Sequence, residues 1–389
     1  MATKILIAAF GFYPETHGIA QAAYQQALGL HRLGYEITIV TQPSDQPRNA
    51  PFEIITFPIH YNRFTKYTQR RTIKAYQRFL IESNFEVLFF HCWETWISEL
   101  AIPVLDQIKG KNILISHGTT IHLRYPGLKG WLRWLLDRPK AWHFSQKLTL
   151  FDHYVFLSEK HDKQRMWDVM EAKRLGISNF SIIPNGANPA FSQPTAFDFK
   201  ENFGIPNAKI LLCVGNYSRE KGQRELIKLF IKLSPENTIL VFIGSHFNAY
   251  SQNLEQAVGN RLNKTVYLLE QLTMEEIQAA YDAADVFVSA TYTEVQPLVL
   301  LDAMAVGVPF LCRDVGAVSE LEGGLCFTNQ MEFMKKLQWL LNHPLNCKHL
   351  GQKGQTAVKR IYTWEKSTEQ YHLLIQNLNE SVSKVNERI

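Results

Sequence analysis

The stretch that decides the fold runs from residue 284 to residue 316 and reads ADVFVSATYTEVQPLVLLDAMAVGVPFLCRDVG. An apolar strand pattern is followed by a helical pattern that begins near Pro297 and ends at Gly307, and then by a second apolar strand. Glu294 and Asp302 interrupt this apolar sequence, and a carboxylate in such a helix is costly unless it is paired or faces a polar cleft. In an open α/β sheet, that cleft lies beyond the carboxyl ends of the strands, where helix N-termini bind anions. We therefore expect a ligand site here.

Length and composition set the broad class of the protein. The chain has 389 residues, which suits two domains of ordinary size, and its apolar fraction of 46% is ordinary for a soluble α/β protein. Five cysteines form no CxxC pair, and without a secretory leader this odd count favours reduced thiols. No apolar run reaches the ~18 to 20 residues of a membrane-spanning helix. We expect a cytoplasmic protein, either soluble or peripheral at the inner face of the membrane.

Strand and helix patterns alternate in two successive passes along the chain. The first pass begins with KILIAAF at residue 4 and the second with KILLCVG at residue 209, after a polar stretch. Short apolar strands between amphipathic helices are typical of parallel sheets covered on both faces, so the sequence predicts two doubly wound α/β domains. The expected boundaries are 1–187 for the N-terminal domain, 188–206 for a linker and 207–365 for the C-terminal domain.

Five further motifs precede Glu294 and Asp302 along the chain. They are FYPETHGIAQAAYQQALGLHRLGYEITIVT (12–41), ISHG (115–118), VFLSE (155–159), IIPNGAN (182–188) and VGNYSREKG (214–222). All six motifs, in this order, resemble those of the retaining GT-B glycosyltransferases that use nucleotide-sugar donors, glycosyltransferase family 4 or group 1. Glu294 and Asp302 match the signature of that family, which is Glu, seven residues, then Glu or Asp.

The resemblance implies both a fold and an activity. The fold is GT-B, with two Rossmann-like domains facing across a cleft and residues 366–389 packing back onto the N-terminal, acceptor-side domain. The activity is metal-independent transfer of a hexose-type sugar, with retention, from a nucleoside-diphosphate sugar to a hydroxyl of a glycan or of a lipid-linked glycan.

The same resemblance places the donor in the C-terminal domain. Lys221 would hold the diphosphate, Glu294 the donor sugar and Asp302 the ribose. The family has an Arg where this chain has Asn216, so Arg219 and Arg224 are candidates for the missing charge.

The loop after the first acid departs from the family, because Val, Gln and Pro stand where the family has Gly-Phe-Gly. Proline removes a backbone N–H that could face the sugar, so the identity of the sugar does not carry over. The donor-binding residues expected are Gly18, Asn216, Arg219, Lys221, Glu294, Val295, Gln296, Pro297, Leu298 and Asp302.

The N-terminal domain would supply histidines. His117 follows an apolar strand at its carboxyl end, and by resemblance it contacts the sugar near the anomeric centre. With Glu294 and Lys221 it completes the expected catalytic set. His17, which precedes Gly18 where the family usually has a second glycine, is an acceptor-side candidate together with His91 and His122.

No Asp-x-Asp triplet occurs in the sequence, so we expect neither a metal nor a cofactor beyond the nucleotide-sugar co-substrate. GxGxxG and GxxxxGK[ST] are also missing, which disfavours dehydrogenases and P-loop enzymes. The alternatives left open are a catalytically silent sugar-nucleotide-binding or scaffold protein and a GT-B epimerase or phosphorylase.

Positive charge is concentrated in the first domain, where residues 61–151 contain 14 basic and 6 acidic side chains. Segments 63–79 and 123–142 mix Arg and Lys with aromatic and leucine residues, as do segments that lie on anionic bilayers, although a solvated face has the same composition. An anionic membrane surface is therefore a candidate partner. Nucleic acid is not expected, because no recognition motif accompanies the charge.

Overall fold

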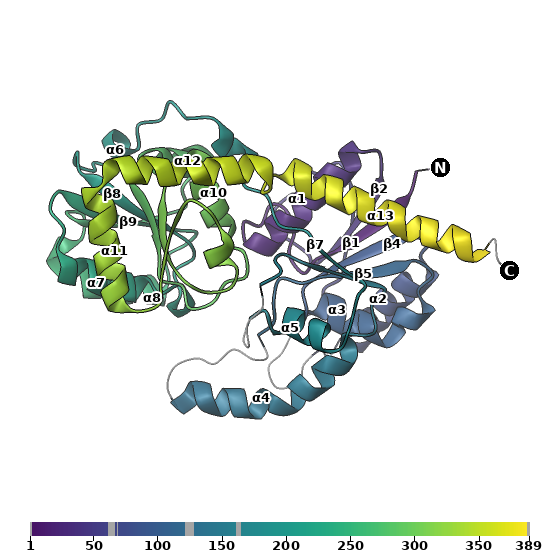
Figure 1. The fold of residues 1–389 in the computed structure, drawn as a ribbon. Coiled ribbons are helices and arrows are strands. Elements are labelled where there is room, and N and C mark those ends of the chain that lie inside the picture. Colours follow the sequence, from purple (N-terminus) through teal and green to yellow (C-terminus); the bar gives the residue numbers. More distant parts are fainter. Residues whose placement is uncertain (1, 61–66, 68, 121–127, 161–164, 387–389) are drawn as a thin grey trace. The chain divides into compact units, whose positions relative to one another are not determined.

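The computed structural model describes residues 2–60, 67, 69–120, 128–160 and 165–386. The chain forms two compact units (Figure 1). Met1–Asn185 and Trp364–Ile389 make up the first unit, and Gly186–Thr363 make up the second.

Within the described residues, the first unit holds a seven-stranded parallel sheet in the order β3-β2-β1-β4-β5-β6-β7. Its central strands are short runs of buried apolar residues, as a parallel sheet covered on both faces requires. The strands are β1 (Lys4–Ala8), β2 (Glu36–Thr41), β3 (Glu53–Thr56), β4 (Val87–His91), β5 (Lys111–Ile115), β6 (His153–Phe156) and β7 (Phe180–Ile182).

Helices cover both faces of this sheet, with α1 and α13 on one face and α2, α3 and α5 on the other (Figure 1). The last helix is part of this core, since Tyr371, Leu374 and Ile375 are buried in one cluster with Ile5 and Ile7. The helices are α1 (Gly18–Arg32), α2 (Arg70–Glu82), α3 (Trp96–Ala101), the 3₁₀ turn η1 (Ile102–Gln107), α4 (Leu128–Lys147), α5 (Trp167–Arg174) and α13 (Trp364–Asn386).

The second unit, in its described residues, holds a six-stranded parallel sheet in the order β10-β9-β8-β11-β12-β13. The strands are β8 (Lys209–Val214), β9 (Thr238–Gly244), β10 (Val266–Glu270), β11 (Val286–Ser289), β12 (Phe310–Arg313) and β13 (Gly324–Phe327).

Successive side chains of β8 enter two different apolar clusters, so this sheet is also covered on both faces. Ile210 and Leu212 pack with residues of α9 and α10, whereas Leu211 and Cys213 pack with residues of α7, α8 and α11. The helices are α6 (Phe199–Asn202), α7 (Gln223–Leu233), α8 (Ala249–Val258), α9 (Met274–Asp282), α10 (Leu298–Val306), α11 (Gln330–Asn342) and α12 (Pro344–Arg360), with the 3₁₀ turns η2 (Pro189–Ser192), η3 (Arg219–Lys221), η4 (Gly259–Arg261) and η5 (Val318–Glu320).

The helix ends follow the sequence signals with one exception. Thr273 and Glu276 form both hydrogen bonds of the capping box at the start of α9, and Gly307 ends α10 in the left-handed conformation with φ 89°. Pro297 does not occupy the first helical position that the sequence predicts. Its backbone is extended, with ψ 117°, so it precedes the helix and α10 begins at Leu298.

Residues 188–206, which the sequence suggests as a linker, lie within the second unit. They form η2 and α6. Although the stretch is mainly polar, it contains Phe191 and Phe199, which are buried in the core of this unit. Phe191 lies 5.0 Å from Tyr281 between ring centroids. The units therefore meet in sequence at residues 185–186, and again at residues 363–364.

Candidate functional site

The donor-site candidates of the second unit gather where β8 and β11 end at their carboxyl edge. β8 leads into η3, and β11 leads into the loop before α10. The two loops are joined directly, because Tyr292 N donates to Glu220 O at 2.8 Å and Thr291 Oγ1 donates to the same oxygen at 3.2 Å. The topology therefore brings two motifs, whose paired residues Lys221 and Glu294 are 73 positions apart, into one local structure.

Lys221 and Glu294 form an ion pair at this edge, with 2.5 Å between Nζ and Oε1. Thr291 Oγ1 lies 3.4 Å from the same carboxylate oxygen. Burial lowers the pKa of the Lys221 ammonium, but the carboxylate of Glu294 more than offsets this effect, and the net pKa is raised. In this contact the two expected catalytic charges neutralise each other.

Two glycines allow the loops to approach this closely. Gly222, with φ 68°, packs on the carbonyl of Ala290, and a Cβ atom there would also lie 3.2 Å from Ala290 Cβ. Gly316, with φ 54°, packs on Glu294, and a Cβ atom there would lie 2.7 Å from Glu294 C and 2.9 Å from Val295 O. Both positions combine a left-handed backbone with no room for a side chain, so both require glycine.

Asn216 and Arg219 lie in the loop before α7 and are exposed. The carboxamide oxygen of Asn216 accepts a hydrogen bond from Ser245 Oγ at 2.9 Å, so this side chain is held against the end of β9. Arg219 begins η3, two residues before Lys221, and its guanidinium is in solvent. The structure thus puts Arg219 in the same short loop as Lys221.

The residues after Glu294 differ in exposure. Val295 and Gln296 are buried, so the Val295 side chain belongs to the protein interior. The backbone of Val295 is also held, because its oxygen accepts the N–H of Ala317 at 2.8 Å. Pro297 and Leu298 are half-buried, and Leu298 packs on the core that lies under α10.

Asp302 lies on the second turn of α10 and is half-buried. Its Oδ1 accepts the backbone N–H of Asn188 at 2.8 Å, which ties α10 to the residue that caps η2. Burial raises the pKa of this carboxyl to about 7, and the hydrogen bond from Asn188 only partly offsets that effect. The acid is therefore close to its titration midpoint at neutral pH.

In the first unit, His91 and His117 are buried side by side at the carboxyl ends of β4 and β5. His91 Nδ1 lies 3.1 Å from His117 Nε2, and the rings stack with 5.3 Å between centroids. The other nitrogen of His91, Nε2, lies 2.9 Å from Gln26 Oε1 on α1. The sequence points to both histidines but not to Gln26, because a glutamine in a helix carries no distinctive signal.

His17 is the N-cap of α1, and Gly18 is the first residue of that helix. The ring of His17 accepts the N–H of Ala20 through Nδ1 at 3.3 Å, lies 3.0 Å from Glu15 Oε2 through Nε2 and stacks on Phe10. This imidazole therefore has a local structural role at the start of α1, where the family usually has a second glycine. His122 lies outside the described residues.

A buried carboxylate below the His117 loop has no signal in the sequence. Asp168 of α5 accepts hydrogen bonds from Trp93 Nε1, at 2.9 Å, and from Ser116 Oγ. Burial raises its pKa to about 6. Ser116 Oγ in turn lies 3.0 Å from the N–H of Gly118, so Asp168 supports the turn that carries His117.

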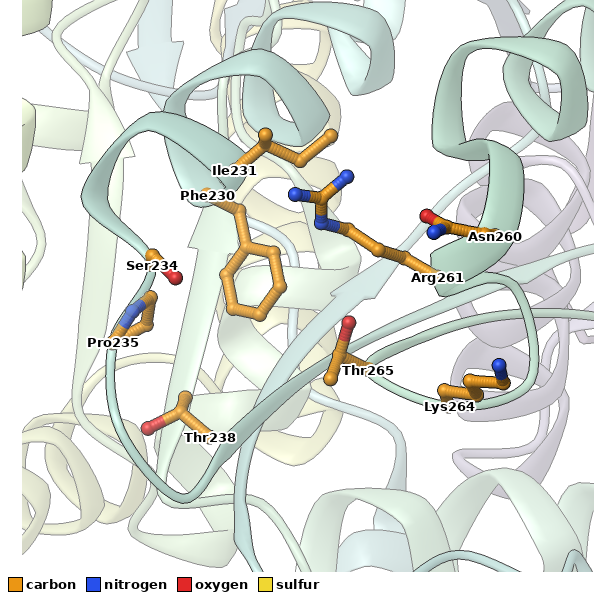
Figure 2. Close-up of a pocket in the computed structure, with 9 residues that line it drawn as sticks. All are labelled: Phe230, Ile231, Ser234, Pro235, Thr238, Asn260, Arg261, Lys264 and Thr265. Atoms are coloured by element: carbon orange, nitrogen blue, oxygen red, sulfur yellow. The ribbon is translucent and has the colours of Figure 1, made fainter.

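A hollow of about 310 Å³ lies at the opposite, amino edge of the second sheet, beside Thr238 at the start of β9. Figure 2 shows the Arg261 guanidinium extending toward the ring of Phe230 in this hollow. Ligands of open α/β sheets bind at carboxyl edges. This hollow is at the amino edge and is therefore not part of the candidate site at Lys221 and Glu294.

In the part of the chain that the structure describes, no three His, Cys, Asp or Glu side chains are grouped so as to hold a metal ion. The described helices include none with the length and apolar character needed to cross a bilayer.

Two family models match successive parts of the chain. The model described as Glycosyltransferase Family 4 matches residues 16–191, and the model described as Glycosyl transferases group 1 matches residues 196–357.

Proteins similar along nearly the whole chain include the alpha-monoglucosyldiacylglycerol synthase of Acholeplasma laidlawii, which is 23% identical over 98% of this chain and 100% of its own length. Among solved structures, sucrose-phosphate synthase from Thermosynechococcus elongatus matches with a TM-score of 0.78 and 18% identity, over 97% of this chain and 100% of that chain. Anabaena HepE in complex with UDP and glucose matches with a TM-score of 0.74 and 13% identity, over 96% of this chain and 100% of that chain.

Proposed function

Because this chain belongs to the GT-B glycosyltransferases, as both family matches and the shared fold identify it, we propose that it transfers a hexose-type sugar from a nucleoside-diphosphate sugar to an acceptor hydroxyl, with retention at the anomeric carbon. The observation that carries the proposal is the contact between Lys221 and Glu294 at the carboxyl edge of the second sheet.

Donor binding would separate this ion pair. A diphosphate oxygen would replace Glu294 as the partner of Lys221, since a charge-assisted hydrogen bond to phosphate is of comparable strength. The released carboxylate of Glu294 would then accept hydrogen bonds from hydroxyls of the donor sugar. The two residues of this contact would therefore supply both a cation for the leaving group and an anion for the sugar.

The transfer step would take place on one face of the sugar. The acceptor oxygen forms a bond to the anomeric carbon, the bond from that carbon to the diphosphate oxygen breaks, and the acceptor proton passes to the departing diphosphate. Lys221 and the backbone N–H groups in the first turn of α10 would stabilise the charge that develops on the leaving group. We propose no metal in this step, because the sequence lacks the Asp-x-Asp triplet that would bind one beside a diphosphate.

Asp302 is proposed to bind the ribose. One of its oxygens holds Asn188, and the other would accept a ribose hydroxyl. Because the pKa of this acid is raised to about 7, nucleotide binding through the carboxylate would favour its ionised form.

A lipid-linked acceptor at an anionic membrane surface is supported by an exposed apolar face on α4. Its five large side chains recur at the spacing of one helix face, and each is at least 41% exposed in place of being buried. They are Leu128, Trp131, Leu132, Leu135 and Leu136. Such a face, on a segment rich in Lys and Arg, fits the headgroup region of an anionic bilayer. The similar Acholeplasma protein is named for a diacylglycerol glycolipid.

Titration with UDP and GDP, followed by assays with their sugars, tests the function. Lys221→Met should weaken nucleoside diphosphate binding, whereas Lys228→Met, which removes an exposed lysine from α7, should not. The parent protein should also hydrolyse its donor slowly without acceptor and give a product whose anomeric proton shows retention by NMR. Binding without any turnover would indicate a silent sugar-nucleotide-binding protein, and equal binding by both lysine variants would refute the site.

A further inference from the structure

Three buried polar side chains form a hydrogen-bonded chain in the first unit. Gln26, on α1, is 2% exposed, His91, at the end of β4, is 1% exposed, and His117, just beyond β5, is 8% exposed. The contacts run from Gln26 Oε1 to His91 Nε2 at 2.9 Å and from His91 Nδ1 to His117 Nε2 at 3.1 Å. Each histidine therefore contacts its neighbour through a defined ring nitrogen.

The contact with Gln26 determines where the protons lie. As the structure orients this carboxamide, its oxygen faces the ring, and because a carboxamide oxygen only accepts, His91 Nε2 carries the hydrogen. In a neutral imidazole the other nitrogen is then an acceptor, so His91 Nδ1 accepts from His117 Nε2. That bond leaves Nδ1 of His117 without a hydrogen. Among the described residues, Nδ1 has no hydrogen-bond partner.

The surroundings keep both rings neutral. Burial lowers the pKa of His117 to about 3, and the nearby charges of Arg165 and His17 act in the same direction. Burial, and then the neighbouring His117, lower the pKa of His91 well below its ordinary range. Glu94 and Asp168 are the nearby acids, but Glu94 accepts from Thr120 and Asp168 from Trp93, and both have raised pKa values.

The amide nitrogen of Gln26 is buried and has no partner, which is unfavourable by about 1 to 3 kcal/mol. An apolar residue of similar volume would avoid this unfavourable term if the position served packing alone. The oxygen of Gln26, in contrast, is fully engaged with His91.

We propose that His91 and Gln26 are positioning residues that hold His117 as the neutral tautomer with hydrogen on Nε2, so that Nδ1 is presented as a hydrogen-bond acceptor for a hydroxyl of the donor sugar. This inference rests on the proposed function, because it takes the reacting sugar as the group that meets His117. Glycosyl transfer passes through a transition state with oxocarbenium character. A neutral ring that accepts a sugar hydroxyl adds no positive charge beside that centre, whereas an imidazolium would.

The direct test is the protonation of the ring nitrogens in the full-length protein labelled with ¹⁵N-histidine. Two-bond ¹H–¹⁵N correlation spectra distinguish a nitrogen that carries hydrogen from one that does not. His117→Gln assigns the signals. The expected pattern for His117 is hydrogen on Nε2 and none on Nδ1, unchanged between pH 5 and pH 8. Hydrogen on Nδ1, or a doubly protonated ring in that range, would overturn the proposal.

Variants then connect the tautomer with the reaction. Gln26→Met and His91→Leu remove the two acceptors and should lower kcat by about tenfold or more, the size of loss found at metal sites when the partner that orients a histidine ligand is removed. His91→Gln, which keeps an acceptor oxygen, should recover most of kcat. Gln25→Met, on the same helix but outside the chain of hydrogen bonds, is the control.

Nucleoside diphosphate affinity should not change in any of these variants, because the side chains proposed to bind it, Lys221 and Asp302, lie in the second unit and Gly18 is left in place. If Gln26→Met leaves both the His117 spectrum and kcat unchanged, Gln26 has no positioning role. If the parent protein transfers no sugar, the proposed function fails, and the parent spectrum still decides the tautomer.

Discussion

Gly316→Ala is the substitution that most sharply tests the local structure around Glu294. Gly316 has φ 54°, and an alanine in the left-handed region is unfavourable by about 1 to 2 kcal/mol. Its Cβ would also lie within 3.0 Å of Glu294 C and Val295 O, so the loop must move. Overpacking of this kind adds about 1 to 3 kcal/mol. We therefore expect a loss of about 2 to 5 kcal/mol in the free energy of unfolding of the second unit.

Gly204→Ala is a matched control in the same unit. Gly204 has φ 61°, but no atom lies within 4 Å of a Cβ atom built there, so only the backbone term of about 1 to 2 kcal/mol applies. The difference between the two variants in urea unfolding isolates the contact with Glu294. Displacement of this carboxylate by about 1 Å should reduce kcat/KM by about 100-fold in Gly316→Ala, whereas Gly204→Ala should retain parent activity. Equal stability and equal activity in the two variants would refute the reasoning.

Four further outcomes are expected. Glu294→Gln should lower kcat by at least about tenfold. It should not weaken UDP or GDP binding, because the carboxylate that competes with the diphosphate for Lys221 is removed. Weaker binding measured by calorimetry would contradict this. In the parent, protonated Asp302 stabilises the fold; this stabilisation is complete below pH 3.8 and is lost as pH rises through about 7, because the pKa of this acid is raised in the folded protein. Asp302→Asn has no such dependence, so its melting temperature minus that of the parent should increase over that pH range. A constant difference would exclude the raised pKa. EDTA should leave activity intact, and a loss restored by Mg²⁺ or Mn²⁺ would rule out metal independence. Sedimentation with anionic vesicles at low salt should decrease in Leu136→Glu. It should not decrease in the control Leu345→Glu, whose exposed leucine lies on α12. If the two variants sediment equally, the membrane contact lies elsewhere.

The family, the fold and most strands were predictable from the sequence, because apolar runs and capping residues act locally. Both parallel sheets and the family matches confirm these predictions. β3 and β13 were not anticipated, since short edge strands such as EIIT (53–56) carry little apolar pattern. The buried anchors Phe191 and Phe199 were concealed in a stretch of mainly polar composition.

From the sequence, the motifs indicated which residues could belong to the site, but not which of them are in contact. Lys221 and Glu294 are 73 positions apart, and Asn188 and Asp302 are 114 positions apart, so both contacts depend on the tertiary fold. Gln26 and Asp168 could not be found at all, because their roles arise from burial beside histidine and serine partners and not from any spacing. The donor and acceptor roles of the expected residues stay predictions, as does the docking of segments 63–79 and 123–142, of which 63–66, 68 and 123–127 lie outside the described residues.

The packing of α13 on the first unit has a consequence for biosynthesis. During synthesis at about 5 to 20 residues per second, the N-terminal half of the chain leaves the ribosome well before Tyr371, Leu374 and Ile375 exist. Until then, the apolar surface that these residues complete, including the ring of Phe89 on which Tyr371 packs, is open to water and to other chains. The second unit is continuous in sequence and can close its core without waiting. The nascent protein should therefore need chaperone protection at its first domain until its last helix has been made.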